Sequence, residues 1–395
     1  MTAPHRAPVD VYAGLKDRLL TMATAEHVIN LAGNVDPDIG GLVIVGGQNN
    51  THGTPSKRRG PKPTAFDAAR QLQRERPDVT VLIQPDVHKR HAASVDHPFP
   101  INADDPPGGT LIDVARTLES YIDAYRRNGS DYAILPTGYL DAGMGPEFQA
   151  VVLKGNTVKR TDVLAHFPLS TQWLVAAGAR KQLIAGIGRS IHPVLLSLES
   201  RTNPTDPRRV VDGLHEVLAA AGEQVGLWHT DLSALDGLAN GAWCGGIGLL
   251  AGNRHIVAPG NTAIPRRPKD KTPNVLLPDW LRYQKAATMT INWFANGHEP
   301  TCDCGLCFGR KLTRFGTSTA DHLEAHRHNM LATIELVRRV LTAQDSRQAQ
   351  WAQMLADARA VHAAAAVATQ VMTIAFDAPL KNWANTNPVP NPAVR

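Results

Sequence analysis

The chain has 395 residues, of which 43% are hydrophobic and 19% are charged, and its net charge is +5. This length holds one barrel-sized domain with an appendage or two ordinary domains, and the composition excludes general disorder. No apolar run approaches the roughly 20 residues of a membrane span, and charged side chains interrupt residues 1–20. We therefore expect a cytoplasmic protein without a signal peptide, and the positive charge favours a polyanionic partner.

Eight short apolar segments in the first two thirds of the chain predict buried parallel strands, because Gly, Pro, Thr or Asp soon follows each. They are residues 27–31, 41–45, 79–83, 132–135, 163–167, 182–185, 225–228 and 242–244. Amphipathic helical patterns lie between them, for example over residues 111–122 and 210–218. Eight such units predict an α/β fold, a closed (β/α)8 TIM barrel over residues 27–278. An open doubly wound sheet is the alternative, but no Gly-x-Gly-x-x-Gly follows the first segment.

From Asp279 the pattern becomes helical. We predict helices over residues 279–296, about 319–342 and 346–374, with Ser318 and Asp321 capping the second, and an irregular tail after Ala378. From the N-terminus, we expect a segment 1–26, the barrel 27–278, a zinc-binding helical subdomain 279–377 and a flexible tail 378–395.

Two loops are rich in positive charge. Residues 49–63 carry four Lys or Arg side chains among Gly and Pro, and residues 265–273 carry another four. Such loops are either ordinary solvated surface or contacts to a phosphate backbone, and the sequence leaves both interpretations open.

Three of the four cysteines stand within six residues, as Cys302-Asp303-Cys304-Gly305-Leu306-Cys307. This spacing brings three thiolates into one turn, which is typical of a metal site in a reducing compartment. His326 and His328 are the candidates for the fourth ligand, and three Cys with one His form a closed, structural zinc site. An iron–sulfur cluster is the other metal option, but it requires a fourth cysteine, and Cys244 lies in the barrel.

A parallel barrel followed by Cys-x-Cys-x-x-Cys and a later His-Asn resembles the tRNA-guanine transglycosylase family of queuine and archaeosine type, over roughly residues 80–345. The resemblance implies that Cys302, Cys304, Cys307 and His328 bind a structural Zn2+ ion. It also implies a pentosyltransferase that exchanges a guanine in nucleic acid for a 7-deazaguanine base. One aspartate attacks the sugar to give a covalent intermediate, and a second handles protons and reads the base. A DNA-modifying branch of the family uses the same chemistry.

The resemblance also implies partners. These are nucleic acid, either DNA or tRNA, and the 7-deazaguanine base, with no membrane; a homodimer and a heterodimer both remain open. The candidate contacts to the nucleic-acid backbone are the basic residues beside the cysteine cluster, Arg310, Lys311 and Arg314.

Site residues follow from the family pattern. Asp86, just after the segment 79–83, fits the base-handling aspartate, and Gly186 and Gly188 fit a glycine-rich strand end that contacts the base. In an alternative alignment, the Gly-Gly after that aspartate is Gly46-Gly47, and Ile44-Val45 then stands in its place.

The position of the nucleophile falls on Gly245 or Gly246, which carry no carboxylate. Asp231, at the preceding strand end, is the candidate replacement, unless it caps the following helix. A non-catalytic relative that binds nucleic acid or a catalytic partner subunit is therefore the alternative function. A third interpretation is a metal-dependent hydrolase, with His229, Asp231 and Asp86 among its ligands.

Overall fold

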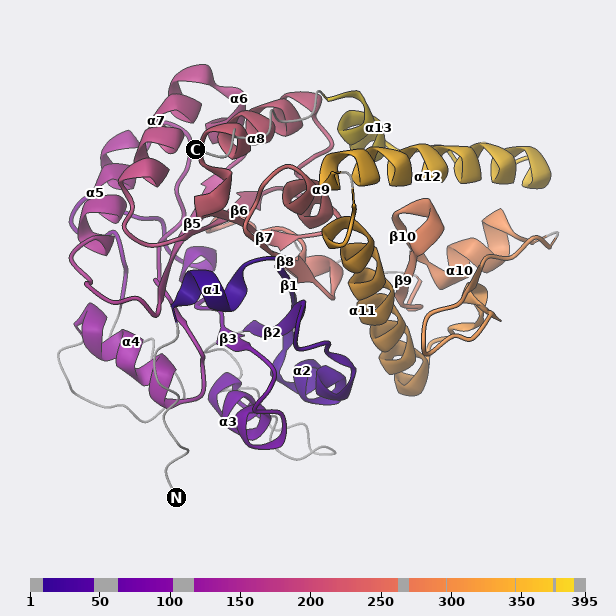
Figure 1. Ribbon diagram of the computed structural model, residues 1–395, viewed down its shortest axis with the longest axis horizontal. Coiled ribbons are helices and arrows are strands. Elements are labelled where there is room, and N and C mark those ends of the chain that lie inside the picture. Colours follow the sequence, from indigo (N-terminus) through magenta and orange to yellow (C-terminus); the bar gives the residue numbers. More distant parts are fainter. Residues whose placement is uncertain are drawn as a thin grey trace.

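The computed structural model describes residues 10–45, 63–101, 117–261, 270–295, 297–344, 346–371 and 374–386. Eight parallel strands form one sheet in the order β3-β2-β1-β8-β7-β6-β5-β4, which curls into a nearly closed barrel surrounded by helices (Figure 1). The expected α/β architecture of TIM-barrel type is confirmed.

The strands are short, and nearly all of their residues are buried. They are β1 (Arg18–Thr24), β2 (Gly40–Val45), β3 (Val81–Ile83), β4 (Ala133–Ile134), β5 (Val163–Ser170), β6 (Val194–Glu199), β7 (Val225–Thr230) and β8 (Cys244–Gly248). One face of the strands forms the barrel interior, with Met22, Leu82 and Trp228 among its side chains. The other face packs on the helices, so both faces are apolar and the strands read as continuous apolar runs.

Two of the eight predicted strands are wrong. Residues 27–31 belong to helix α2 (Ala25–Leu31), and residues 182–185 belong to helix α7 (Ala177–Arg189). A run of four or five apolar residues fits a buried helix as well as a strand, so periodicity alone does not separate them. The two strands that take their places are β1 and β6, and β1 lies within the segment 1–26 that we expected to precede the barrel.

Helices cover the outside of the barrel in chain order. Besides α2 and α7 they are α3 (Ala65–Glu75), α4 (Leu118–Arg127), α5 (Gly145–Gly155), α6 (Gln172–Val175), α8 (Arg208–Ala221), α9 (Ser233–Ala239) and α11 (Thr319–Leu341). Helix α11 packs against α9, α2 and β1, which is the position of the helix that completes the eighth βα unit (Figure 1). The segment between β8 and α11 is therefore an insertion into the last βα unit.

Helix α1 (Val11–Leu15) covers the N-terminal end of the barrel. Val11 and Leu15 are buried in the same cluster as the interior side chains, and the Tyr12 ring lies 5.3 Å from the ring of Trp243, just before β8. The C-terminal ends of the strands, where barrel active sites lie, are at the opposite end, which we call the barrel mouth.

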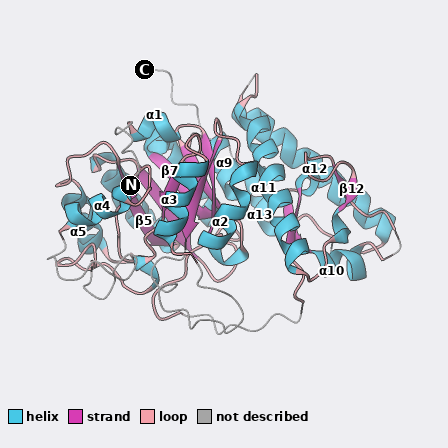
Figure 2. Ribbon diagram, turned by 90° about the horizontal axis from the view of Figure 1, so that it is seen from below, coloured by secondary structure: helices cyan, strands magenta, loops and turns pink. Residues whose placement is uncertain are grey.

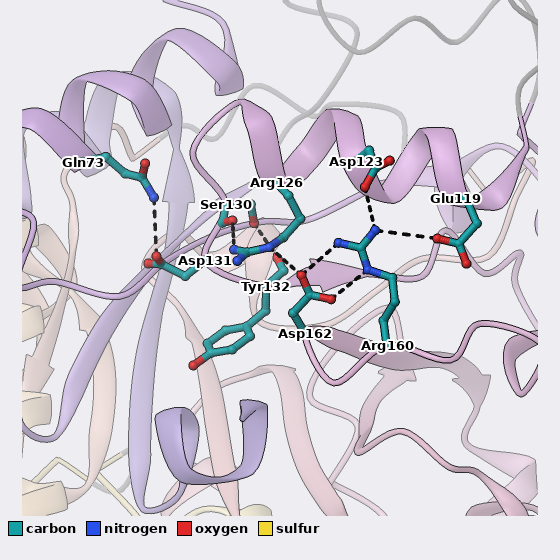
Figure 3. A network of polar contacts seen from close by, with 9 residues as sticks. All are labelled: Gln73, Glu119, Asp123, Arg126, Ser130, Asp131, Tyr132, Arg160 and Asp162. Carbon is teal, nitrogen blue, oxygen red and sulfur yellow. Dashed lines mark hydrogen bonds and ion pairs between the residues drawn. The ribbon is translucent and has the colours of Figure 1, made fainter. Parts of the chain in front are cut away.

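Side chains join β3 to β4, the two strands at the ends of the sheet order. The backbone N–H of Val81 donates to Asp131 Oδ2 at 2.7 Å, and that of Ile83 donates to Ser130 Oγ at 3.1 Å. Figure 3 shows Asp131 beside a second polar group, in which Asp162 accepts from Arg126 and Arg160. These polar contacts help to close the barrel between β3 and β4, the two shortest strands of the sheet.

The insertion and the C-terminal helices form a lobe beside the barrel (Figure 2). Its elements are the antiparallel hairpin β9 (Asn274–Leu277) and β10 (Arg282–Lys285), α10 (Ala286–Thr288), a π-helical turn (Met289–Trp293), β11 (Thr301–Cys302), β12 (Arg310–Lys311), α12 (Arg347–Thr369) and α13 (Ala378–Asn385). The capping box of α11 is confirmed, since Ser318 Oγ accepts from the Asp321 N–H at 3.1 Å.

Two expectations for the lobe are wrong. A single helix over residues 279–296 is replaced by β10, α10 and the π-helical turn, because the backbone of β10 pairs antiparallel with β9. Helix α13 occupies the start of the expected irregular tail, where Asp377 caps it by accepting from Leu380 N–H. No helix in the described ranges has both the length and the hydropathy that crossing a bilayer requires. Most of the basic loops 49–63 and 265–273, and Gly46-Gly47, lie outside the described residues.

Candidate metal centre and barrel mouth

Cys302, Cys304, Cys307 and His328 come together in the lobe. Each offers one ligand atom, and the four atoms lie within 4.8 Å of one another. The Nδ1 atom of His328 is 3.3 Å from the Sγ atom of Cys307 and 3.6 Å from that of Cys304. Sulfur and nitrogen ligands of one tetrahedral zinc ion are about 3.5 Å apart. The cluster therefore has the ligands and the dimensions of a metal site, which we call the Cys3His centre.

A tight turn between β11 and β12 brings the thiols together. The N–H groups of Cys307 and Phe308 both donate to the Cys304 carbonyl, at 2.9 and 3.2 Å. Phe308 and Gly309 then adopt positive φ angles of 48° and 79°, which turn the chain back into β12. Because this geometry is local, the spacing of the cysteines alone was enough to predict it.

His328 and Asn329 on α11 hold the centre against the hairpin. His328 Nε2 donates to the Leu276 carbonyl at 2.7 Å, which directs Nδ1 toward the thiols. Asn329 accepts from the Leu276 N–H at 2.7 Å, and its amide donates to the Asn274 carbonyl at 2.8 Å. A carbonyl that fixes the second ring nitrogen is typical of metal-binding histidines. His326 is not in the cluster, and its ring lies 4.9 Å from that of His27.

The basic residues beside the cysteine turn have carboxylate partners. Arg310 and Arg314 share Glu324, each at 3.0 Å, and Lys311 lies 2.8 Å from Glu299. Arg314 also donates to Cys307 Sγ at 3.2 Å, so it supports the thiol cluster directly. Arg310 and Lys311 are 49% and 64% exposed, whereas Arg314 is 19% exposed, so the first two are the more accessible of these three side chains.

Asp86 lies at the barrel mouth, three residues after β3. Lys89 donates to the Oδ2 atom of Asp86 at 2.7 Å, and the Asp86 side chain is 12% exposed. A short 3-10 turn (Val87–Lys89) follows and directs the side chain of His88 into the barrel. The position of Asp86 at a strand end is as the sequence predicts.

Three buried histidines meet beside Asp86, one from the turn after β3 and two from strands. The ring of His88 lies 5.3 Å from that of His166 on β5 and 5.7 Å from that of His229 on β7. Asp86, His88 and His229 each offer a ligand atom within 4.8 Å of the others, which makes a second candidate metal group. The Asp86-x-His88 spacing at a strand end was the only local signal.

A bulge in β7 aims His229 into the mouth. The pairing of β7 with β8 shifts register between Leu227 and Thr230, and His229 has a positive φ of 51°. Non-glycine residues in this conformation cost of order 1–3 kcal/mol and cluster at functional sites. The Nδ1 atom of His229 faces the Asn253 carbonyl at 3.2 Å, which lies close because Gly248 on β8 has no side chain.

Burial keeps these histidines neutral. It lowers the pKa of His229 to about 4, against the opposing charge of Asp86, and lowers the pKa values of His88 and His166 well below 6.5. His166 satisfies its ring nitrogens with Ser197 Oγ at 2.8 Å and the Gln84 amide at 3.5 Å. Three ring nitrogens have no hydrogen-bond partner within the described residues: Nδ1 and Nε2 of His88, and Nε2 of His229. Such buried groups cost about 1–3 kcal/mol each when unsatisfied, which indicates a ligand site.

Asp231 lies between β7 and α9, and hydrogen bonds hold its carboxylate. Its Oδ1 atom accepts from the Ser233 N–H at 3.0 Å, and Asn203 donates to Oδ2. Burial raises the pKa of Asp231, while Arg254 and the Ser233 hydrogen bond act in the opposite direction. Both carboxylate oxygens therefore have partners, but the N-cap position of α9 is Leu232, which makes no side-chain cap hydrogen bond, so Asp231 is not the N-cap of that helix.

The glycines at the expected nucleophile position leave room for other side chains. A Cβ atom on Gly246 would lie 2.4 Å from the Trp228 ring, and one on Gly245 would lie 2.8 Å from Leu19. The Trp228 indole fills the barrel interior and donates to Gln84 Oε1 at 2.7 Å. No carboxylate fits at either position without displacing this core.

The expected position of Gly186 and Gly188 at a strand end is wrong. Both residues lie in the last turns of α7, and a Cβ atom on Gly186 would meet the Phe148 ring at 2.2 Å. Because α7 runs back from the C-terminal end of β5, these glycines lie toward the opposite end of the barrel from Asp86. Gly186 instead permits close packing of α7 on α5.

Neither a protein-family model nor a curated protein matches this chain.

Proposed function

We propose that the chain is a transglycosylase that exchanges guanine for a 7-deazaguanine base in DNA or tRNA, with the barrel mouth as its active site. The observation that carries the proposal is the position of the Cys3His centre, which is inserted into the eighth βα unit of a barrel whose mouth carries Asp86. This is the combination that the resemblance to the tRNA-guanine transglycosylases implies. The cluster of three Cys and one His suits Zn2+ as a structural ion.

Asp86 is the carboxylate we assign to the base. It lies beside neutral histidines in a largely water-excluded position, where a carboxylate can accept hydrogen bonds from the N1–H and amino groups of a guanine-type ring or carry a proton. Asp231 is the remaining candidate for the covalent step, and it would have to release Ser233 or Asn203 to attack a sugar.

Nucleic acid would approach through the exposed charges of Arg310 and Lys311 and the basic loops. Phosphate contacts release counterions, so affinity should fall steeply with added salt. Charge reversal at Arg310 and Lys311 should weaken binding to all sequences alike, measured by fluorescence anisotropy on DNA and on tRNA. Binding that does not depend on salt would contradict this part of the proposal.

The decisive experiment measures base exchange. Purified protein is incubated with DNA or tRNA and a 7-deazaguanine base, and the nucleosides are then analysed by mass spectrometry. Asp86→Asn should remove nearly all exchange while the Cys3His centre keeps its metal, and the matched variant Asp96→Asn, at an exposed carboxylate of the same loop, should leave exchange unchanged. If Asp231 is the nucleophile, Asp231→Asn should abolish any covalent adduct. Absence of exchange by wild type on both nucleic acids would overturn the proposal.

A second candidate is a non-catalytic subunit that binds nucleic acid or a catalytic partner. The packing of Trp228 and Leu19 against Gly246 and Gly245 favours it, because the usual nucleophile position is filled by core side chains. Salt-dependent nucleic-acid binding without any exchange is the result that would select this candidate.

A further inference from the structure

We propose that Asp86, His88 and His229 bind a divalent transition-metal ion at the barrel mouth, separate from the Cys3His centre. The inference concerns metal binding alone and does not rest on the proposed base exchange. It assigns the mouth a Lewis acid, which the resemblance to the transglycosylases does not imply.

The first argument is the donor set. One carboxylate oxygen and two imidazole nitrogens lie within 4.8 Å of one another. Two histidines and one carboxylate suit Zn2+, Fe2+, Co2+ or Mn2+, and three protein ligands leave positions open for water or substrate. Lys89 bonds Asp86 Oδ2 at 2.7 Å, and because a carboxylate has two oxygens this bond is compatible with a metal bond.

The second argument is that the imidazoles are prepared for a ligand. His88 is 0% exposed, and within the described part of the chain neither of its ring nitrogens has a hydrogen-bond partner. His229 is 1% exposed, and its Nδ1 atom faces the Asn253 carbonyl at 3.2 Å, which leaves the lone pair on Nε2. That nitrogen also has no hydrogen-bond partner among the described residues. The same device orients His328 in the Cys3His centre, where the Leu276 carbonyl fixes the other ring nitrogen.

The third argument is the backbone. Asp86 and His88 follow β3, and His229 comes from β7, so the group spans the C-terminal end of the barrel, where the barrel supports catalytic groups. His229 reaches the group through a bulge and a left-handed backbone conformation. His166 lies beside the group, but its ring nitrogens face Ser197 and Gln84, and it is not among the three proposed ligands.

Cobalt distinguishes the two sites in the whole protein. Metal-depleted protein is reloaded with Co2+, and cobalt per chain is measured together with the absorption spectrum. We expect two ions in wild type: one with thiolate-to-cobalt charge transfer, from the Cys3His centre, and one with ligand-field bands only. Cys304→Ser should remove the charge-transfer band and keep the second ion.

Variants of the mouth should give the complementary result. His88→Gln, His229→Asn and Asp86→Asn should each lose one cobalt and keep the charge-transfer band. The matched control is His192→Gln, at a buried histidine directly before β6 and so at the other end of the barrel, and it should keep both ions. Wild type that binds one cobalt per chain overturns the proposal without any variant. Retention of two ions by a folded mouth variant also overturns it, whereas loss of base exchange alone would not.

Discussion

Backbone carbonyls orient the key imidazoles of this chain. The Leu276 carbonyl accepts from His328 Nε2, and the Asn253 carbonyl faces His229 Nδ1, so in each ring the opposite nitrogen points into a cluster. The orientation of His328 depends on α11 and β9, and that of His229 on the bulge in β7. Local sequence therefore indicates which residue types can bind an ion, but the neighbours decide which of them do.

The first prediction separates two histidines on one helix. His328→Gln should lose the ion of the Cys3His centre, because its Nδ1 atom lies 3.3 Å from the Cys307 thiol. His326→Gln should keep this ion, because the His326 ring packs on His27 instead. Elemental analysis of gel-filtered protein measures the difference. Equal metal content in the two variants would contradict the assignment.

The second prediction concerns pH and the polar group of Figure 3. Burial tends to raise the pKa of Asp162, but hydrogen bonds and charge from Arg160, together with Arg126, outweigh it and lower the pKa. A carboxyl whose pKa is lower when folded contributes stability above its unfolded pKa of about 4, and this contribution is lost as pH falls through the folded value.

Asp162→Asn should therefore lower the free energy of unfolding at pH 7. When the pH falls below about 4, the variant should lose less of its remaining stability than wild type does. The cost at pH 7 should be large, about 3–5 kcal/mol, because Arg126, whose side chain is only 6% exposed, would keep its charge without this partner. Asp123→Asn is the matched control, since that carboxylate is 51% exposed and bonds the same Arg160, so about 0–1 kcal/mol is expected. Urea denaturation across pH gives both values. Parallel pH profiles for wild type and Asp162→Asn would refute the assignment.

At the scale of elements, the sequence predicted the number of strands correctly but misplaced two. Strand β1 carries Arg18 and Thr21 within its apolar run, and Arg18 donates to the Pro37 carbonyl at 2.6 Å from the strand start. Helix α2 also has seven residues of mixed polarity, and it packs on the barrel from outside. Only the pairing of β1 with β2 and β8 separates these cases, and that pairing is not visible in a local window.

The cysteine turn and the capping box of α11 were predictable because both are local. The mouth group was not, because β3 and β7 are brought together by the closed sheet. The helix expected over residues 279–296 failed for the same reason: the hairpin of β9 and β10 depends on Asn329, far along the chain, which bonds the backbone of β9.

A third prediction tests the packing inside β8. Gly246→Ala should destabilise the fold by about 1–3 kcal/mol, because the added methyl group would lie 2.4 Å from the Trp228 ring, which is 0% exposed. Gly252→Ala is the matched control, since nothing lies within 4 Å of its Cβ position. Thermal and urea unfolding measure both variants. If they are equally stable, Trp228 does not fill the space that a nucleophile would need.

At the scale of the molecule, α11 belongs to both the barrel and the lobe. Its N-terminal half carries His328 and Asn329, which hold the cysteine turn and β9. Its C-terminal half, with Leu336, Val337 and Val340, is buried in the same apolar cluster as α9. One helix thus completes the eighth βα unit and carries the fourth ligand of the Cys3His centre.

The last prediction follows from this shared helix. Structural metal contributes folding free energy to the segments that its ligands join, so removal of the ion with a chelator should raise hydrogen exchange in β9 to β12 and in the first turns of α11. The second half of α11 should remain protected, because its burial against α9 does not depend on the ion. Hydrogen-exchange mass spectrometry of holo and chelated protein resolves the two halves. Loss of protection across the whole of α11 and the barrel strands would show instead that the ion stabilises the entire molecule. Unchanged protection in β9 to β12 would show that the turn holds its shape without it.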